Sequence, residues 1–165
     1  MNDQLQSIVV GTAGLTVALV ISALLTVFRN GGSDFATHRI SRLIWIAALL
    51  HTIHFTEETL TGFYQRFPEL LGLTPWPVSF FVVFNACWVI LWIICIPLLK
   101  THRTARVPIW FLGISSAINA IAHPIMSIIT GGYFPGLWTS PVVGILGFIL
   151  LRALVSATQE RRVPG

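Results

Sequence analysis

Charged residues are scarce in this sequence: they make up 10% of its 165 residues, whereas hydrophobic residues make up 55%. Soluble globular domains contain about 25% charged residues, so the composition excludes an ordinary soluble protein and indicates an integral membrane protein. Polar stretches long enough for a separate soluble domain are also missing. With about 20 apolar residues in each membrane-spanning helix, the chain has room for about five helices. We therefore expect a single transmembrane domain over residues 1–165.

Cysteine is equally scarce, and the positions of the two cysteines exclude a disulfide between them. Cys87 and Cys95 lie in the same apolar segment, eight residues apart. Because this segment must be a single helix, the two thiols are too far apart to pair. The cysteines therefore say little about the redox compartment, and we interpret both as packing residues.

Five apolar segments are long enough to cross the ~30 Å hydrocarbon core of a bilayer, at about 1.5 Å of rise per helical residue. They predict an all-α fold, a polytopic membrane helix bundle with about five transmembrane helices. The predicted helices cover residues 7–28, 43–64, 78–99, 108–130 and 141–159.

Lysine and arginine are divided unequally between the two sides of the predicted bundle. Eight of the ten lie in the connections after the first and third predicted helices and in the C-terminal tail, while the opposite side has Arg66 alone. Cytoplasmic loops are enriched in Lys and Arg, so we expect the N-terminus outside and the C-terminus inside, in a plasma or inner membrane. The placement of these charges explains the net charge of +4 without a nucleic acid partner; the expected partner is the lipid bilayer. The eight residues are Arg29, Arg39, Arg42, Lys100, Arg103, Arg106, Arg161 and Arg162.

Four ionisable side chains interrupt the second predicted helix, in the nine-residue stretch HTIHFTEET. If this helix starts at residue 43 on the cytoplasmic side, His51 and His54 lie ~12 and ~17 Å deep. Glu57 and Glu58 then lie at ~21–23 Å. At about 100° per residue, His51, His54 and Glu58 share one face, whereas the adjacent glutamates point about 100° apart. We expect one glutamate to face a cavity and the other to meet a neighbouring helix.

The third and fourth predicted helices place further polar side chains at the same depth. Asn119 and His123 lie ~17 and ~23 Å from the cytoplasmic side, and Asn85 lies at ~20 Å. An ionisable group inside a membrane costs at least ~2.5–3.5 kcal/mol on insertion scales and is tolerated mainly where it faces partners or a cavity. The agreement in depth therefore predicts a polar pocket enclosed by the second, third and fourth helices, with a mouth that faces outward.

The most specific interpretation of this pocket is a metal centre. His54 and Glu58, four residues apart on one helix, and His123 from the fourth helix are the predicted ligands. Histidine and carboxylate ligands suit Zn²⁺ or non-haem iron, and an open coordination position would polarise a carbonyl or activate water. We hypothesise a metal-dependent membrane enzyme that acts on a hydrophobic or lipid-like small molecule. The spacing is neither the H-E-x-x-H of zinc proteases nor the E-x-x-H of di-iron bundles.

Two other functions use the same side chains without a metal. In one, Glu57 or Glu58 is a catalytic general acid or base, with a histidine as relay. In the other, the protein is not an enzyme and binds or transports an ion, a proton or a small amphiphile. A polar network that only fixes helix packing is a further alternative. The predicted ligand-binding residues are His51, Asn85, Asn119, Tyr133 and Arg152.

Arg152 is the remaining charge inside a predicted helix, about eleven residues from the outer end of the fifth. Two environments would satisfy it. Its long side chain can extend inward to the cytoplasmic headgroups, or its guanidinium can pair with Glu57 or Glu58. The first alternative leaves the polar pocket without a cation, and the second adds one to it.

Two motifs resemble those of a known family. The stretch HFTEE resembles the motif that gives the HXXEE-domain membrane proteins their name, and the stretch NAIAHPIMSIITGGYFPGLWTS resembles the family's Asn-x-x-x-His helix followed by a Tyr-x-Pro-Gly turn. The resemblance covers about residues 40–155. It implies a small multi-helix membrane protein and supplies no reaction. The roles of His51, Asn85 and Arg152, which lie outside the motifs, depend on depth alone. The matching residues are His54, Glu57, Glu58, Asn119, His123, Tyr133, Pro135 and Gly136.

Overall fold

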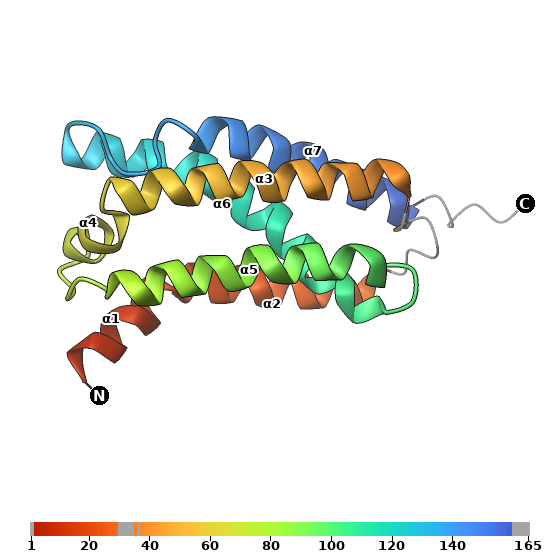
Figure 1. The fold of residues 1–165 in the computed structure, drawn as a ribbon, viewed down its shortest axis with the longest axis horizontal. Helices are drawn as coiled ribbons and strands as arrows, with labels where there is room; N and C mark the ends of the chain where they lie inside the picture. The colour runs from red at the N-terminus through yellow and green to blue at the C-terminus, as the bar shows by residue number, and fades with distance from the viewer. Residues whose placement is uncertain (1, 30–34, 36, 160–165) are drawn as a thin grey trace, which may run out of the picture.

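The computed structural model describes residues 2–29, 35 and 37–159, and within these residues every regular element is a helix (Figure 1). The all-α prediction is therefore confirmed for the described part of the chain. The elements are α1 (Asp3–Gly11), α2 (Ala13–Phe28), α3 (His38–Leu60), α4 (Phe63–Leu70), α5 (Val78–Leu98), the short 3-10 helix η2 (Arg103–Ala105), α6 (Arg106–Thr130) and α7 (Ser140–Gln159).

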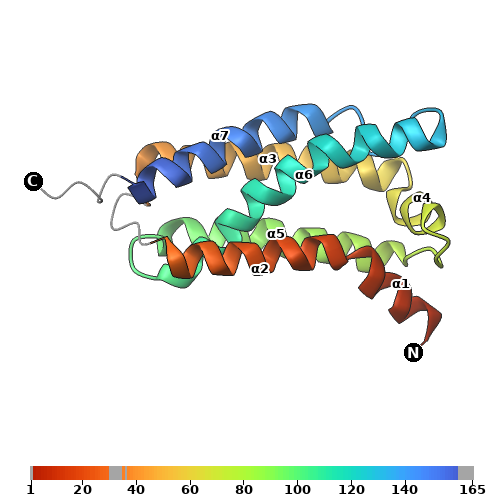
Figure 2. The same cartoon turned by 180° about the vertical axis from the view of Figure 1, so that it is seen from behind.

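The long helices form two layers that one oblique helix connects. In Figures 1 and 2, α2 and α5 lie in one layer, α3 and α7 lie in the other, and α6 crosses from the first layer to the second. The short helices α1 and α4 lie at one end of the long axis, and α7 ends at the opposite end. Side chains of α3 and α6 can therefore meet inside the bundle, between the layers.

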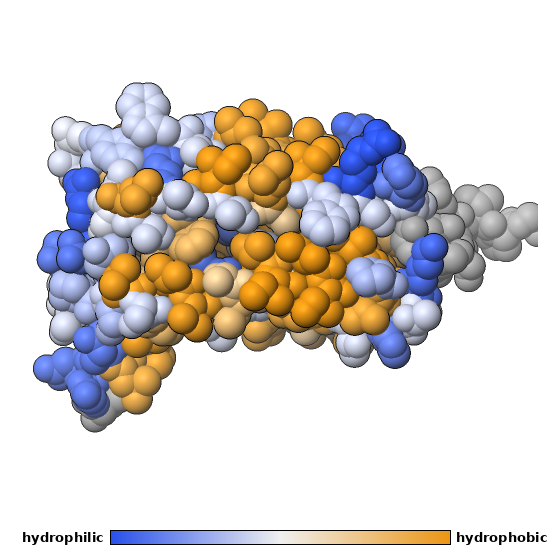
Figure 3. Space-filling view, viewed as in Figure 1, coloured by the Kyte–Doolittle hydropathy of each residue, from blue (hydrophilic) through white to orange (hydrophobic). Residues whose placement is uncertain are grey.

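Three helical segments are long and apolar enough to cross a membrane: Val78–Leu98, Arg103–Thr130 and Ser140–Thr158. The α1–α2 pair, bent by 47°, would add a fourth if it crosses as one unit. Although α3 has 23 residues, its arginines, histidines and glutamates make it less apolar than these segments. Figure 3 shows hydrophobic side chains across the middle of one face of the molecule and hydrophilic side chains towards both ends. The number of five spans stays a prediction.

The first predicted helix is divided in two at Thr12. The cause is a set of contacts that hold α1 against the loop before α5. Ser7 Oγ donates a hydrogen bond to the carbonyl of Thr74 at 2.6 Å, and Trp76 Nε1 donates one to Ser7 Oγ at 3.1 Å. The ring of Trp76 also lies against Gly11, where a Cβ atom would overlap it. These contacts could not be predicted, because they join segments about 70 residues apart.

The second predicted helix, 43–64, differs from α3 at both ends. α3 starts five residues earlier because Thr37 caps it: the Thr37 hydroxyl accepts a hydrogen bond from the N–H of Ile40 at 3.3 Å. It ends at Leu60, and the chain then turns at Gly62, whose φ of +80° favours glycine. The short helix α4, which the apolar pattern did not predict, follows this turn and lines part of the cavity described below.

Tight packing of α7 on α6 fixes the connection between them, residues 131–139. Glycines on α7 face small side chains on α6: a Cβ atom at Gly147 would lie 2.7 Å from the Cβ of Ser116, and one at Gly144 would overlap Ala120. The bundle end where α7 finishes has an apolar core. Its fully buried members include Ile44, Trp110, Leu112, Leu150 and Leu154.

Candidate metal centre

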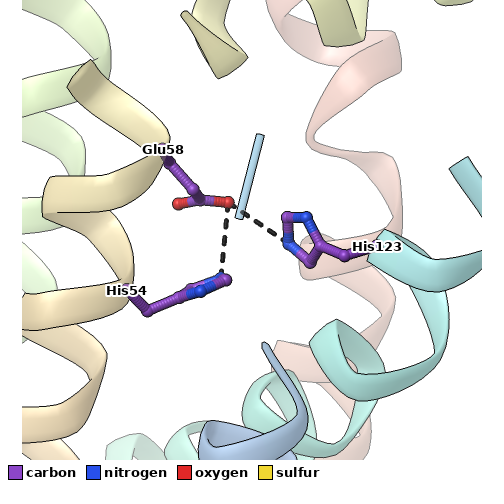
Figure 4. Close-up of side chains that lie close together, drawn as sticks. All are labelled: His54, Glu58 and His123. Carbon is purple, nitrogen blue, oxygen red and sulfur yellow. Dashed lines mark ion pairs between the residues drawn. The ribbon is translucent and has the colours of Figure 1, made fainter. Parts of the chain in front are cut away.

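Two histidines and a glutamate from two helices converge in the protein interior (Figure 4). His54 and Glu58 lie four residues apart on α3, so their side chains share one face of that helix, and His123 reaches them from α6. Glu58 Oε1 lies 3.5 Å from His54 Nε2 and 3.3 Å from His123 Nε2. The three potential ligand atoms lie within 4.8 Å of one another, and all three residues are buried. The structure thus brings together the three residues predicted as metal ligands.

A backbone carbonyl orients the Nδ1 nitrogen of His123. His123 Nδ1 lies 2.6 Å from the carbonyl oxygen of Pro135, in the α6–α7 connection. A carbonyl oxygen can only accept a hydrogen bond, so Nδ1 carries the proton. In the neutral ring Nε2 then has a free lone pair, and this lone pair is directed at Glu58 Oε1.

A hydroxyl group holds His54 in the same tautomer. His54 Nδ1 lies 2.7 Å from Thr139 Oγ1, which in turn lies 2.5 Å from a carboxylate oxygen of Glu57. Because the ionised carboxylate can only accept, the hydroxyl donates to Glu57 and accepts the N–H of His54. His54 Nε2 is therefore the unprotonated nitrogen. It is buried and has no hydrogen-bond partner among the described residues.

The cluster has the electrostatics and spacing of a cation site. Two imidazole lone pairs and a carboxylate oxygen face one another, an arrangement that is repulsive unless a proton or a metal ion lies between them. For zinc bonds of about 2.0–2.1 Å, neighbouring ligand atoms in a tetrahedron lie about 3.3–3.4 Å apart. Two of the three separations between ligand atoms, 3.3 and 3.5 Å, are close to this value, and the third is within 4.8 Å. Hydrogen bonds at Nδ1 that orient metal-binding histidines are the usual arrangement around such ions.

Glu57 points away from the cluster and holds the α6–α7 connection. Its carboxylate accepts hydrogen bonds from the Tyr133 hydroxyl at 2.7 Å, the Trp138 N–H at 3.1 Å and the Thr139 N–H at 3.0 Å, in addition to the Thr139 hydroxyl. Both oxygens are used. The two glutamates therefore diverge as expected, with Glu58 in the pocket, but Glu57 meets the α6–α7 connection where a neighbouring helix was expected.

These hydrogen bonds bear on two predicted roles. A catalytic role for Glu57 stays a prediction, and the geometry gives this residue a positioning role through Thr139 and His54. Tyr133 was expected to bind a ligand, and in the structure its hydroxyl serves Glu57. Burial raises the pKa of Tyr133, and the hydrogen bond to the Glu57 carboxylate raises it further. The phenol therefore stays protonated and donates at neutral pH.

A glycine lets the connection pass over both imidazole rings. Gly136 has φ +86°, a conformation that L side chains rarely adopt. A Cβ atom at this position would overlap the ring of His123 and lie 2.9 Å from Cε1 of His54. The same close approach aligns the preceding carbonyl, that of Pro135, with His123 Nδ1.

A cavity of about 180 Å³ borders the cluster, and Glu58 and His123 belong to both. Its walls come from the α1–α2 bend, α3, α4, α5 and α6. His51, Asn85 and Asn119, which were predicted to bind a ligand, line it as well, so the polar residues predicted at one depth border one cavity. The remaining wall is largely aromatic. The aromatic lining residues are Phe63, Phe67, Trp76, Phe80, Phe81, Phe84, Trp88, Trp92 and Phe111.

Arg152 does not belong to this site. Its exposed side chain lines a second cavity together with Arg39, at the start of α3. Arg39 and Glu58 are separated by 19 residues of helix, or about 28 Å. The structure therefore does not pair Arg152 with Glu57 or Glu58, and it places the arginine near the end of the bundle where α7 finishes.

The sequence did not identify the two groups that orient the histidines, Thr139 Oγ1 and the carbonyl of Pro135, although Pro135 belongs to the Tyr-x-Pro-Gly turn of the resemblance. Both come from the connection rather than from a helix, so helix rise and periodicity do not predict their positions. A weak signal exists for Thr139, because it precedes Ser140 and Pro141, and such a series is typical of a helix N-terminus. The signal locates the residue but does not reveal its partners, His54 and Glu57.

The fold and the site define a helical protein with helices able to cross a membrane and with a buried His–Glu–His cluster. A family model described as "Protein of unknown function with HXXEE motif" matches residues 45–151, and the chain belongs to this HXXEE family. Searches of curated proteins and of solved structures found no match. Of the motif residues in this chain, His54 and Glu58 belong to the cluster, while Glu57 holds the α6–α7 connection that orients the two histidines.

Proposed function

We propose that this protein is a multi-pass membrane protein that holds Zn²⁺ or non-haem iron at His54, Glu58 and His123 and acts on a hydrophobic or lipid-like small molecule. The observation that carries the proposal is the orientation of the two imidazole rings. Each Nδ1 is occupied by an acceptor, so both Nε2 lone pairs are presented to the same carboxylate oxygen. Histidine nitrogens and a carboxylate oxygen are a donor set that zinc and non-haem iron accept.

The cavity supports an enzymatic role for the centre. Three protein ligands leave a coordination position open, and Glu58 and His123 border the space that a small molecule would occupy. A metal at the cluster would supply a Lewis acid that polarises a carbonyl or activates water. The cavity exceeds the ~150 Å³ at which an apolar cavity binds benzene. Its aromatic wall favours an apolar molecule, and His51 and Asn119 would bind polar groups of that molecule.

For the membrane placement we infer five spans, with α3 crossing beside α5 and α7. The distribution of charge supports this placement. Arg39 and Arg42 at the start of α3, and Lys100 and Arg103 between α5 and α6, lie at the bundle end where α7 finishes, whereas Arg66 belongs to α4 at the other end. By the positive-inside rule the first end is cytoplasmic, in a plasma or inner membrane, and the N-terminus is outside. The cavity then lies in the outer half of the bilayer.

A second candidate is binding without chemistry, in which the site holds a proton, an ion or a small amphiphile. The observation that favours it is that the three facing atoms can share a proton in place of a metal. Transport through the bundle is less well supported, because the other half of the bundle has an apolar core in which Ile44, Trp110 and Leu150 are fully buried.

Metal content tests the proposal. The protein is purified in mild detergent without chelators, and zinc and iron per chain are measured by inductively coupled plasma mass spectrometry. We expect close to one ion per chain in the wild type and loss of this ion in both His54→Ala and His123→Ala. His102→Ala, which removes an exposed histidine outside the cluster, is the matched control and should keep the ion. A wild-type protein that stays metal-free after incubation with Zn²⁺ and with Fe²⁺ would favour the second candidate.

A further inference from the structure

A second cavity lies at the opposite end of α3 from the metal centre. It occupies about 580 Å³ between the start of α3 and the last turns of α7. Arg39 and Arg152 enter it from the two helices, and Ser156 and Thr37 add hydroxyl groups. This cavity combines two cations with neutral donors, whereas the cavity at the metal centre has an aromatic wall and a carboxylate. The two cavities therefore select different ligands.

The two arginines have no counter-charge among the described residues. Neither Arg39 nor Arg152 forms an ion pair there, and the described carboxylates belong to the other end of the bundle. Two guanidinium groups in one pocket repel each other, so an anion that lies between them is stabilised by both. Phosphate matches the planar fork of donors that arginine presents. The described carboxylates are Asp3, Glu57, Glu58 and Glu69.

Apolar side chains continue from this pocket along both helices. On α7, Ile149 lines the pocket, and exposed Ile145 and Val142 follow it at the three- and four-residue spacing of one helix face. On α3, exposed Ile46 and Leu49 follow Arg39 at intervals of seven and three residues. The positive charge thus lies at the end of an apolar surface, which is the arrangement that a lipid with a charged headgroup requires.

We propose that this pocket binds the headgroup phosphate of an anionic phospholipid, whose acyl chains lie along the exposed apolar side chains of α3 and α7. Basic pockets between helices on the cytoplasmic side of a membrane are typical sites for such headgroups. A zwitterionic headgroup fits less well, because its ammonium group would meet the two arginines. The proposal rests on the membrane placement inferred above and is independent of the metal centre.

Lipid retention tests the assignment. Full-length protein is equilibrated in mixed micelles with equal amounts of phosphatidylglycerol and phosphatidylcholine of identical acyl chains, and retained lipids are counted by native mass spectrometry. We expect the wild type to retain one phosphatidylglycerol in preference to phosphatidylcholine. Arg152→Gln and Arg39→Gln should each reduce this preference about fivefold, the factor expected for one arginine at an anionic surface. Arg42→Gln, which removes an exposed arginine outside the pocket, is the charge-matched control and should retain the preference.

Three outcomes would overturn the proposal: no preference in the wild type, an equal loss in Arg42→Gln, or no loss in Arg152→Gln and Arg39→Gln. A fourth is displacement of the lipid by millimolar inorganic phosphate, which would show that the pocket takes phosphate without acyl chains. If Arg152→Gln is not monodisperse, Arg39→Gln carries the test. Metal content and vesicle incorporation, measured on the same samples, separate failure of this site from failure of the metal centre or of the membrane placement.

Discussion

Replacement of Thr139 by valine should weaken metal binding about 10- to 100-fold. Valine keeps the shape of threonine but removes the hydroxyl that accepts from His54 Nδ1 and donates to Glu57. A hydrogen bond to a charged group contributes about 1.5–3 kcal/mol, and a tenfold change in affinity corresponds to about 1.4 kcal/mol. The expected loss agrees with the effect of removing groups that orient metal-binding histidines. The Thr139 N–H still holds Glu57, so the connection should stay in place.

The assay is competition for Zn²⁺ between the protein and a chromophoric chelator of known affinity, in detergent at constant pH. Thr139→Ser keeps the hydroxyl and should bind within about threefold of the wild type, since the metal ligands are unchanged. Thermal unfolding of the metal-free proteins checks that valine has not disrupted the fold. If Thr139→Val binds zinc as tightly as Thr139→Ser, the hydroxyl does not orient His54 and does not set its tautomer.

Three further predictions follow from the same geometry. Gly136→Ala should abolish metal binding because the new Cβ displaces both imidazole rings. The control Gly72→Ala, with φ +69° and nothing within 4 Å of the new Cβ, should lose only the ~1–2 kcal/mol of stability that a left-handed residue costs, and should keep the metal. Metal content and melting temperature distinguish the two variants. Tyr133→Phe removes one of the four hydrogen-bond donors to Glu57 and should lower the melting temperature by about 3–10 °C. The metal should remain, because Trp138 and Thr139 still hold the carboxylate. An unchanged melting temperature would contradict a stabilising role for the Tyr133 hydroxyl. If the ion is present at about 100 times its Kd, its removal by a chelator should lower the melting temperature of the wild type by about 5–10 °C. The melting temperature of His123→Ala should not change. Equal shifts in the two proteins would place the ion elsewhere.

The convergence of the polar residues could be predicted because helices have a fixed rise and a fixed periodicity. Glu58 follows His54 by four residues, which puts both on one face of any α-helix. Depth estimates then placed Asn85, Asn119 and His123 in the same layer, and the structure brings all of them to one cavity or its border. The divergence of Glu57 and Glu58 followed from the same periodicity.

What could not be predicted depends on loops and on long-range contacts. The tautomers of the histidines are set by Thr139 and Pro135, in a connection whose path depends on the φ of Gly136 and on the packing of α7 against α6. The break at Thr12 likewise depends on contacts with a distant loop. For Arg152 the sequence left two alternatives, and the arrangement of α7 beside the start of α3 excludes the one in which it pairs with Glu57 or Glu58.

X-ray absorption spectroscopy of the wild-type protein loaded with one equivalent of zinc tests the metal centre most directly. A site formed by His54, Glu58 and His123 predicts nitrogen and oxygen ligands at about 2.0–2.2 Å, with the outer-shell scattering of two imidazole rings and no sulfur. A zinc–sulfur distance of about 2.3 Å, the signal of a single imidazole, or failure to bind the ion would contradict a metal centre at these three residues.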